Sequence, residues 1–101
     1  MRTIKMDASK WRSKEDFYEA LAVALGSFDG HGRNADAFQE TMIYYLHLNG
    51  VQPPYEIIVR DSDEILRPFL QEFSTWIQEA RADRRCDPEW GDDIDVKVVV
   101  L

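Results

Sequence analysis

Apolar and polar residues form two kinds of pattern along the chain, one typical of strands and one typical of helices. Short runs rich in β-branched residues predict strands at 2–6, 55–59 and 94–101. Apolar residues that repeat every three or four positions predict helices that begin near Ser13, Asn34 and Pro68. Strands that are separated by helices favour parallel pairing with right-handed crossovers. We therefore expect an α/β fold of two layers, a three-stranded parallel sheet packed against three to four helices.

The first two helices carry recognisable capping residues. Ser13, with Asp16 three residues later, predicts a capping box, and Gly26 is a natural stop for the helix that follows. Asn34 can cap a second helix that runs to about residue 48. The buried stripe of this second helix would consist of Phe38, Met42, Tyr45 and Leu46.

The third helix and the last strand are strongly apolar. Pro68 suits the first position of the helix, because its missing N–H is not needed there. The apolar face of this helix would consist of Phe69, Phe73, Trp76, Ile77 and Ala80. The last strand ends in the run 98–101, Val-Val-Val-Leu, which is too apolar for a sheet with one face in water.

Composition narrows the class of protein. The chain has 101 residues, of which 45% are hydrophobic and 31% charged, and this predicts a single globular domain over residues 1–101. No apolar run is long enough for a membrane span or a signal peptide. The one cysteine, Cys86, cannot form an internal disulfide. We therefore expect a cytoplasmic protein.

The charge balance says more about partners. The chain has 12 basic and 19 acidic residues, a net charge of −7, and five of the basic residues lie before Glu15. A surface this acidic repels nucleic acid and anionic membranes, and it attracts a basic protein. A surface that serves only solubility stays open as the alternative.

Residue types that catalyse reactions or hold cofactors lack the spacing that those functions need. Gly30–Ala35 matches G-x-G-x-x-A, but it follows a helix, whereas the dinucleotide fingerprint follows a strand. His31, His47 and Cys86 have no metal-ligand or nucleophile partner at a recognised spacing. The sequence therefore predicts no catalytic residue, no metal and no cofactor.

An acidic loop at residues 87–93 precedes the last strand. Asp92, Asp93 and Asp95 could hold a cation, but the calcium-loop pattern is absent, so a solvated acidic loop is favoured. The helix before this loop ends in a group of cations, which suit the helix dipole there: Arg81, Arg84 and Arg85.

Two helices offer acidic stripes that stability alone explains poorly. Asp36 and Glu40 lie four residues apart on one face of the second helix, where like charges repel by about 0.2–0.5 kcal/mol. Glu72 and Glu79 share a face of the third helix, away from its apolar residues. If the two helices are adjacent, these acids form one anionic patch. Two ordinary solvated faces remain the alternative.

Two segments match the pattern of a known family. Residues 32–40 read G-R-N-A-D-A-F-Q-E and residues 78–81 read Q-E-A-R. In these segments and in the order of its elements, the chain resembles the barstar family, intracellular inhibitors of the secreted bacterial ribonuclease barnase. The resemblance implies a barstar-like fold whose second helix and preceding loop plug the active site of a small secreted ribonuclease or related toxin. It also implies an inhibitor that is no enzyme and is monomeric when free.

The resemblance further implies which residues bind the partner. Carboxylates would occupy the places of RNA phosphates, with Asp36 and Glu40 from the second helix and Glu79 from the long helix. The loop before the second helix would complete the inhibitory surface. The implied set is His31, Gly32, Asn34, Asp36, Ala37, Glu40 and Glu79.

Several positions depart from the family pattern. Glu40 is one methylene longer than the expected Asp, Gln39 replaces a tryptophan, and Gly30–His31 replaces the loop tyrosines. Residues 61–67 are too few for the extra helix of the family, and residues 87–93 look like an insertion. These changes leave the expected fold intact, but they remove the basis for naming the target ribonuclease. The alternative is a binding or immunity module for a different basic toxin or a non-nuclease protein.

Two further hypotheses concern proton transfer. Asp36 and Glu79 could act as general acid and base, although no nucleophile or orienting group accompanies them at a recognised spacing. A histidine among acids is easier to protonate, so His31 would weaken an anionic face as the pH falls.

Overall fold

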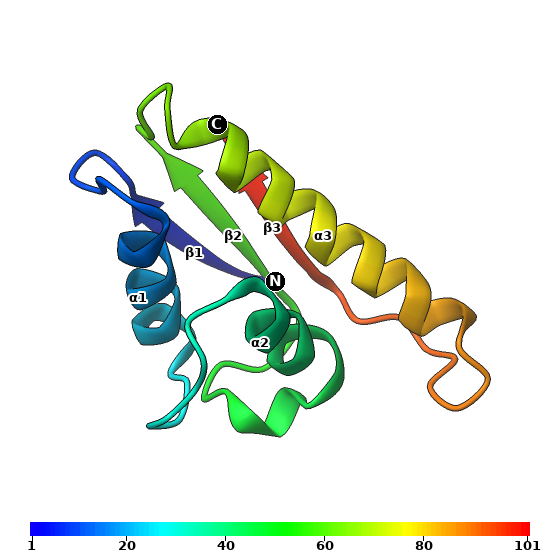
Figure 1. Ribbon diagram of the computed structural model, residues 1–101. Helices are drawn as coiled ribbons and strands as arrows, with labels where there is room; N and C mark the ends of the chain where they lie inside the picture. The colour runs from blue at the N-terminus through cyan, green and yellow to red at the C-terminus, as the bar shows by residue number, and fades with distance from the viewer.

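The computed structural model describes residues 1–101 and contains three strands and three α-helices (Figure 1). In chain order the elements are β1 (Arg2–Asp7), α1 (Lys14–Leu25), α2 (Ala35–Gln39), the π-helical turn η1 (Glu40–Tyr44), the 3-10 turn η2 (Leu46–Leu48), β2 (Tyr55–Arg60), α3 (Arg67–Cys86) and β3 (Val96–Val100). The strands pair in parallel in the order β1-β2-β3. The predicted fold class, a three-stranded parallel sheet packed against helices, is confirmed.

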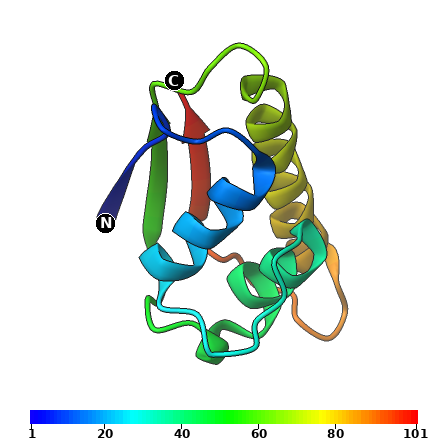
Figure 2. The same cartoon turned by 60° about the vertical axis from the view of Figure 1, so that its left-hand side comes forward.

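The sheet has a buried face and an open face. Figure 2 shows the strands as one layer and the helices together as the other. Alternate residues of β2 and β3, such as Ile57 and Val98, point to the helices and are buried. On the open face, Glu56 accepts a hydrogen bond from Thr3 at 3.1 Å and pairs with Lys97 at 3.5 Å. Polar cross-strand contacts thus cover much of this face.

The prediction that the last strand is too apolar for a sheet with one wet face is wrong. Val98 and Val100 lie on the helix side, while Val99 is half-buried on the open side beside its cross-strand neighbour Ile58. Leu101 lies beyond the strand and is exposed. Apolar residues on the open face of the sheet are therefore accommodated by packing against a cross-strand neighbour, without a second layer to cover them.

The ends of α1 and α3 differ in part from the predicted caps. Gly26 ends α1 in the left-handed conformation, with φ of 63°, as expected. The hydroxyl of Ser13 caps nothing, and Asp16 instead accepts a hydrogen bond from the backbone N–H of Arg12 at 2.7 Å. Ser13 is the N-cap of α1 as predicted, but the reciprocal hydrogen bonds of a capping box do not form. Pro68 occupies the second position of α3, where its missing N–H is equally harmless.

The core joins all the helices through aromatic rings. Phe17 of α1 meets Phe73 of α3 edge-on with centroids 5.0 Å apart, and Tyr18 stacks on Phe38 of α2 at 5.8 Å. Phe38 is fully buried, so it holds the short α2 against both neighbouring helices. None of the helices combines the length and the apolar character that crossing a membrane requires.

The second helix is the element that departs most from the prediction. After α2 the chain widens into η1, turns at Tyr45 and continues as η2, instead of running as one regular helix to about residue 48. Three consecutive residues, Thr41, Met42 and Ile43, are buried, which the π-helical turn allows because it shifts the register of the helix. Tyr45 was expected in the buried stripe and is 49% exposed.

Candidate functional site

The loop before α2 is shaped by a side-chain cap and a close approach. Asn34 accepts a hydrogen bond from the backbone N–H of Ala37 at 2.9 Å, which fixes the first turn of α2 as predicted. A Cβ at Gly32 would come within 3.1 Å of both the Ala37 side chain and the Asn34 amide. A residue with a Cβ at position 32 would therefore require the Ala37 or Asn34 side chain to shift by a few tenths of an ångström. These three residues set the angle at which the loop enters the helix.

His31 lies inside this loop and not on its surface. Its side chain is 4% exposed, and its ring centroid lies 4.5 Å from that of Phe38. Its Nδ1 contacts the carbonyl of Gly32 at 2.6 Å, and its Nε2 contacts the hydroxyl of Thr41 at 2.9 Å. Both ring nitrogens are thus used within the chain, and no carboxylate bonds to them. The idea that His31 weakens the anionic face on protonation stays a prediction.

Thr41 and Arg33 were not expected at the site. Thr41 occupies a buried position of η1, where it tethers the loop histidine to the helix. Arg33 donates a hydrogen bond to the carbonyl of His31 and pairs with Glu19 of α1 at 2.8 Å. The only sequence signal for Arg33 was a basic residue within an acidic segment. Together these contacts tie the loop both to α1 and to the second helix.

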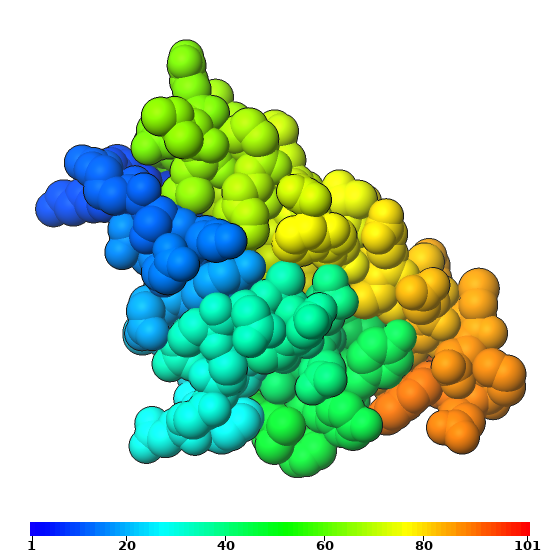
Figure 3. All heavy atoms as spheres, in the orientation of Figure 1, coloured from blue at the N-terminus to red at the C-terminus, as the bar shows by residue number.

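The three acids of the expected partner-binding set are exposed and unpaired. Asp36 lies in the first turn of α2, Glu40 begins η1, and Glu79 lies in the second half of α3. None of their carboxylates makes a hydrogen bond or an ion pair within the chain. Figure 3 shows α2, in teal, against the middle of α3, in yellow, so the two acidic stripes belong to neighbouring elements. Their carboxylates are available to a cationic partner.

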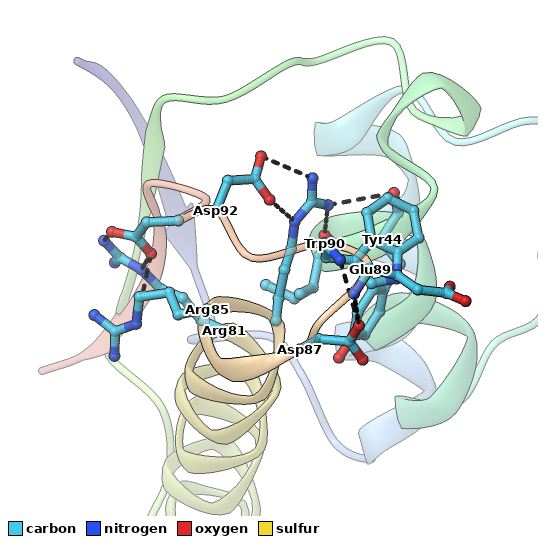
Figure 4. A network of polar contacts seen from close by, with 10 residues as sticks. Tyr44, Arg81, Arg85, Asp87, Glu89, Trp90 and Asp92 are labelled. Carbon is cyan, nitrogen blue, oxygen red and sulfur yellow. Dashed lines mark hydrogen bonds and ion pairs between the residues drawn. The ribbon is translucent and has the colours of Figure 1, made fainter.

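The acids of the 87–93 loop are in a different state. Asp93 binds Arg81 through both carboxylate oxygens at 2.8 Å, and Asp92 binds Arg84 at 2.8 Å and 3.2 Å. These hydrogen bonds lower the pKa of both carboxyls and raise the pKa of the Arg81 guanidinium. Asp92 and Asp93 are exposed, as expected of a solvated loop, but these two of its four acids are paired with arginines (Figure 4). No group of three or more His, Cys, Asp or Glu side chains is arranged to hold a metal ion.

Comparison with known proteins agrees with this architecture. A family model described as Barstar (barnase inhibitor) matches residues 1–100. The chain belongs to the barstar family. A search of the curated proteins found no significant match. By the family's description, its members are inhibitors of barnase, so a protein partner of that ribonuclease type accords with the acidic character of the chain.

The hollows of the molecular surface lie away from α2 and its preceding loop. Surface hollows occur only between β1 and α1, beside the ends of β1 and β2, and near the start of α3. None is lined by a residue of the 27–50 segment or of the second half of α3.

Proposed function

We propose that this barstar-family chain inhibits a barnase-type ribonuclease by covering its active site with α2, the preceding loop and α3. The observation that carries the proposal is the contrast among the acids. Asp36, Glu40 and Glu79 have no partner within the chain, whereas the neighbouring Asp92 and Asp93 are held by arginines. An active site that binds RNA phosphates is cationic, and carboxylates placed against such cations form charge-assisted hydrogen bonds.

The remaining residues of the expected set shape this surface. Asn34, Gly32 and Ala37 fix the entry into α2, and the partner meets the loop backbone that they hold. His31 supports the loop from inside, because its side chain is buried. The large exposed side chain in this loop is Phe28, at 45% exposure, and it supplies the aromatic contact with the partner.

The net charge of −7 gives this inhibitor a long-range attraction for a basic partner. Attraction of this kind speeds encounter and weakens as salt screens it. The close carboxylate–cation pairs act after encounter and slow dissociation.

The test is a double charge reversal, Asp36→Lys with Glu40→Lys, assayed by binding to an immobilised barnase-type ribonuclease. We expect binding to be abolished while far-ultraviolet circular dichroism is unchanged. The matched control is Glu15→Lys with Glu64→Lys, which changes the net charge equally in the first turn of α1 and in the turn before α3, outside α2 and its preceding loop. The control should retain binding with a slower association rate. Persistent binding of the first double variant would show that the proposed face is wrong.

A second candidate is a barstar-family module for a different basic toxin. The longer side chain of Glu40 and the buried His31 favour it, because both change the surface that a barnase-type cleft would meet. It predicts that the wild-type chain leaves the barnase-type ribonuclease active but binds another basic toxin. That binding would still be lost in the Asp36→Lys, Glu40→Lys variant.

A further inference from the structure

We propose that Arg84 is a positioning residue of the inhibitory surface. Together with Trp90 and Asp92 it forms what we call the Arg84 clamp, which ties η1 to α3 and so holds Glu40 in place relative to Glu79. This assignment rests on the proposed function for its biological meaning. The clamp itself follows from contacts within the chain.

Arg84 is a buried cation, and each of its three guanidinium nitrogens donates at least one hydrogen bond. Its side chain is 8% exposed. Nε and Nη2 donate to the two oxygens of Asp92, while Nη1 donates to the carbonyl of Ile43 and lies 3.5 Å from that of Tyr44. The guanidinium carbon lies 4.5 Å from the centroid of the Trp90 ring. A buried charge is tolerated when it is paired and hydrogen-bonded, and here two of the four bonds go to η1.

The carbonyls that Arg84 binds belong to the last turn of η1. The backbone N–H of Tyr45 bonds back to the carbonyl of Glu40 at 2.7 Å, which closes the π-helical turn. The next backbone N–H groups, of Leu48 and Asn49, donate to the carbonyls of Tyr45 and Leu46 and close the 3-10 turn. They do not bond to the carbonyls of Ile43 and Tyr44 at the end of η1. Carbonyls at a helix end need another donor, and Arg84 supplies it from α3.

The 87–93 segment is built to complete this clamp. Asp87 accepts hydrogen bonds from the backbone N–H groups of Glu89 and Trp90, and the N–H of Gly91 donates to the carbonyl of Arg84. The Trp90 ring packs edge-on against Tyr44 at 5.6 Å, and Figure 4 shows both rings beside the end of α3. Residues 87–93, which look like an acidic insertion, thus pack against η1 and support it, and they do not form a separate docking surface.

The clamp bears directly on the two acids. Glu40 is the first residue of η1 and Ile43 lies one turn later, while Glu79 and Arg84 lie on the same α3. Fixing Ile43 to Arg84 therefore fixes the spacing of the two backbone positions that carry these carboxylates before a partner arrives. Preorganised groups lose less conformational entropy on binding, so the gain is expected in a slower dissociation of the complex.

The test compares Arg84→Ala with Arg85→Ala, its neighbour, whose side chain is 52% exposed and reaches Asp93 only at 4.0 Å. Amide hydrogen exchange is measured across the free protein. We expect exchange in residues 40–48 to speed up at least tenfold in Arg84→Ala, with β1 and β2 unchanged, and no change in Arg85→Ala. Uniform acceleration throughout the chain, or none in residues 40–48, would overturn the proposal. If Arg84→Ala does not fold, Asp92→Asn replaces it under the same criteria.

A second arm measures binding to a barnase-type ribonuclease. We expect Arg84→Ala to dissociate about tenfold faster with an unchanged association rate, because the acids remain but their spacing is no longer fixed. An unchanged dissociation rate, with wild-type binding intact, would overturn the positioning role. If the wild-type chain does not bind, the proposed function fails, and the exchange experiment alone decides whether Arg84 positions Glu40.

Discussion

Replacing His31 with alanine should destabilise the fold through the loop that precedes α2. The substitution removes two hydrogen bonds, to Gly32 and Thr41, and a ring packed against Phe38. Each bond contributes about 0.5–1.5 kcal/mol, and the lost packing adds a further part. The Thr41 hydroxyl can turn to the carbonyl of Ala37, 3.3 Å away, so no polar group is stranded. We therefore expect a loss of about 2–3 kcal/mol in the free energy of unfolding.

Equilibrium unfolding in urea measures this loss, and the chain supplies its own control. His47 is exposed in η2, so His47→Ala should change the free energy of unfolding by less than about 0.5 kcal/mol. His31→Phe keeps a ring against Phe38 but loses both bonds, and we expect an intermediate loss of about 1–2 kcal/mol. If His31→Ala unfolds at the same urea concentration as His47→Ala, the buried histidine does not anchor the loop and the reasoning fails.

Three further predictions test other parts of the account. Asn34→Ala removes the cap on the Ala37 N–H and should lower the free energy of unfolding by about 1 kcal/mol in the same urea assay. The hydrogen bond from Arg81 lowers the pKa of the Asp93 carboxyl in the folded protein. The ion pair therefore contributes fully to the free energy of unfolding above the unfolded pKa of Asp, about 3.9. This contribution is lost as the pH falls through the lower pKa of the folded state. Stability should thus decline below about pH 4, and less steeply in Asp93→Asn. Burial raises the pKa of the Tyr55 phenol, so Tyr55→Phe should leave the ultraviolet titration of the folded protein unchanged up to about pH 11.

Most of the fold could be predicted because its signals are local. β-Branched runs, helical spacing, the Asn34 cap and the Gly26 stop each depend on residues that are neighbours in the sequence. The π-helical turn has no such local signal, and its Ile43 carbonyl accepts a hydrogen bond from Arg84, a residue far away in the sequence.

The candidate site likewise has features that could be predicted from local sequence and features that depend on contacts between distant residues. Exposed acids such as Asp36 and Glu79 could be proposed from spacing and resemblance, since charge on a helix surface is visible in the sequence. The buried state of His31 could not, because it depends on Thr41 and Phe38 closing around the ring. The pairing of Asp92 and Asp93 with arginines could not be predicted for a similar reason. The three arginines were noted for the helix dipole, whereas their ion pairs with Asp92 and Asp93 depend on how the loop folds back.

The central claim is that the free acids of α2, η1 and α3 block a ribonuclease active site. The most direct measurement is a titration of this chain into a barnase-type ribonuclease while RNA cleavage is followed at about 0.1 M and about 1 M salt, where the screening length falls from about 10 Å to about 3 Å. We predict complete inhibition at one inhibitor per enzyme at low salt and weaker inhibition at high salt. Full ribonuclease activity in the presence of micromolar inhibitor at low salt would contradict the account.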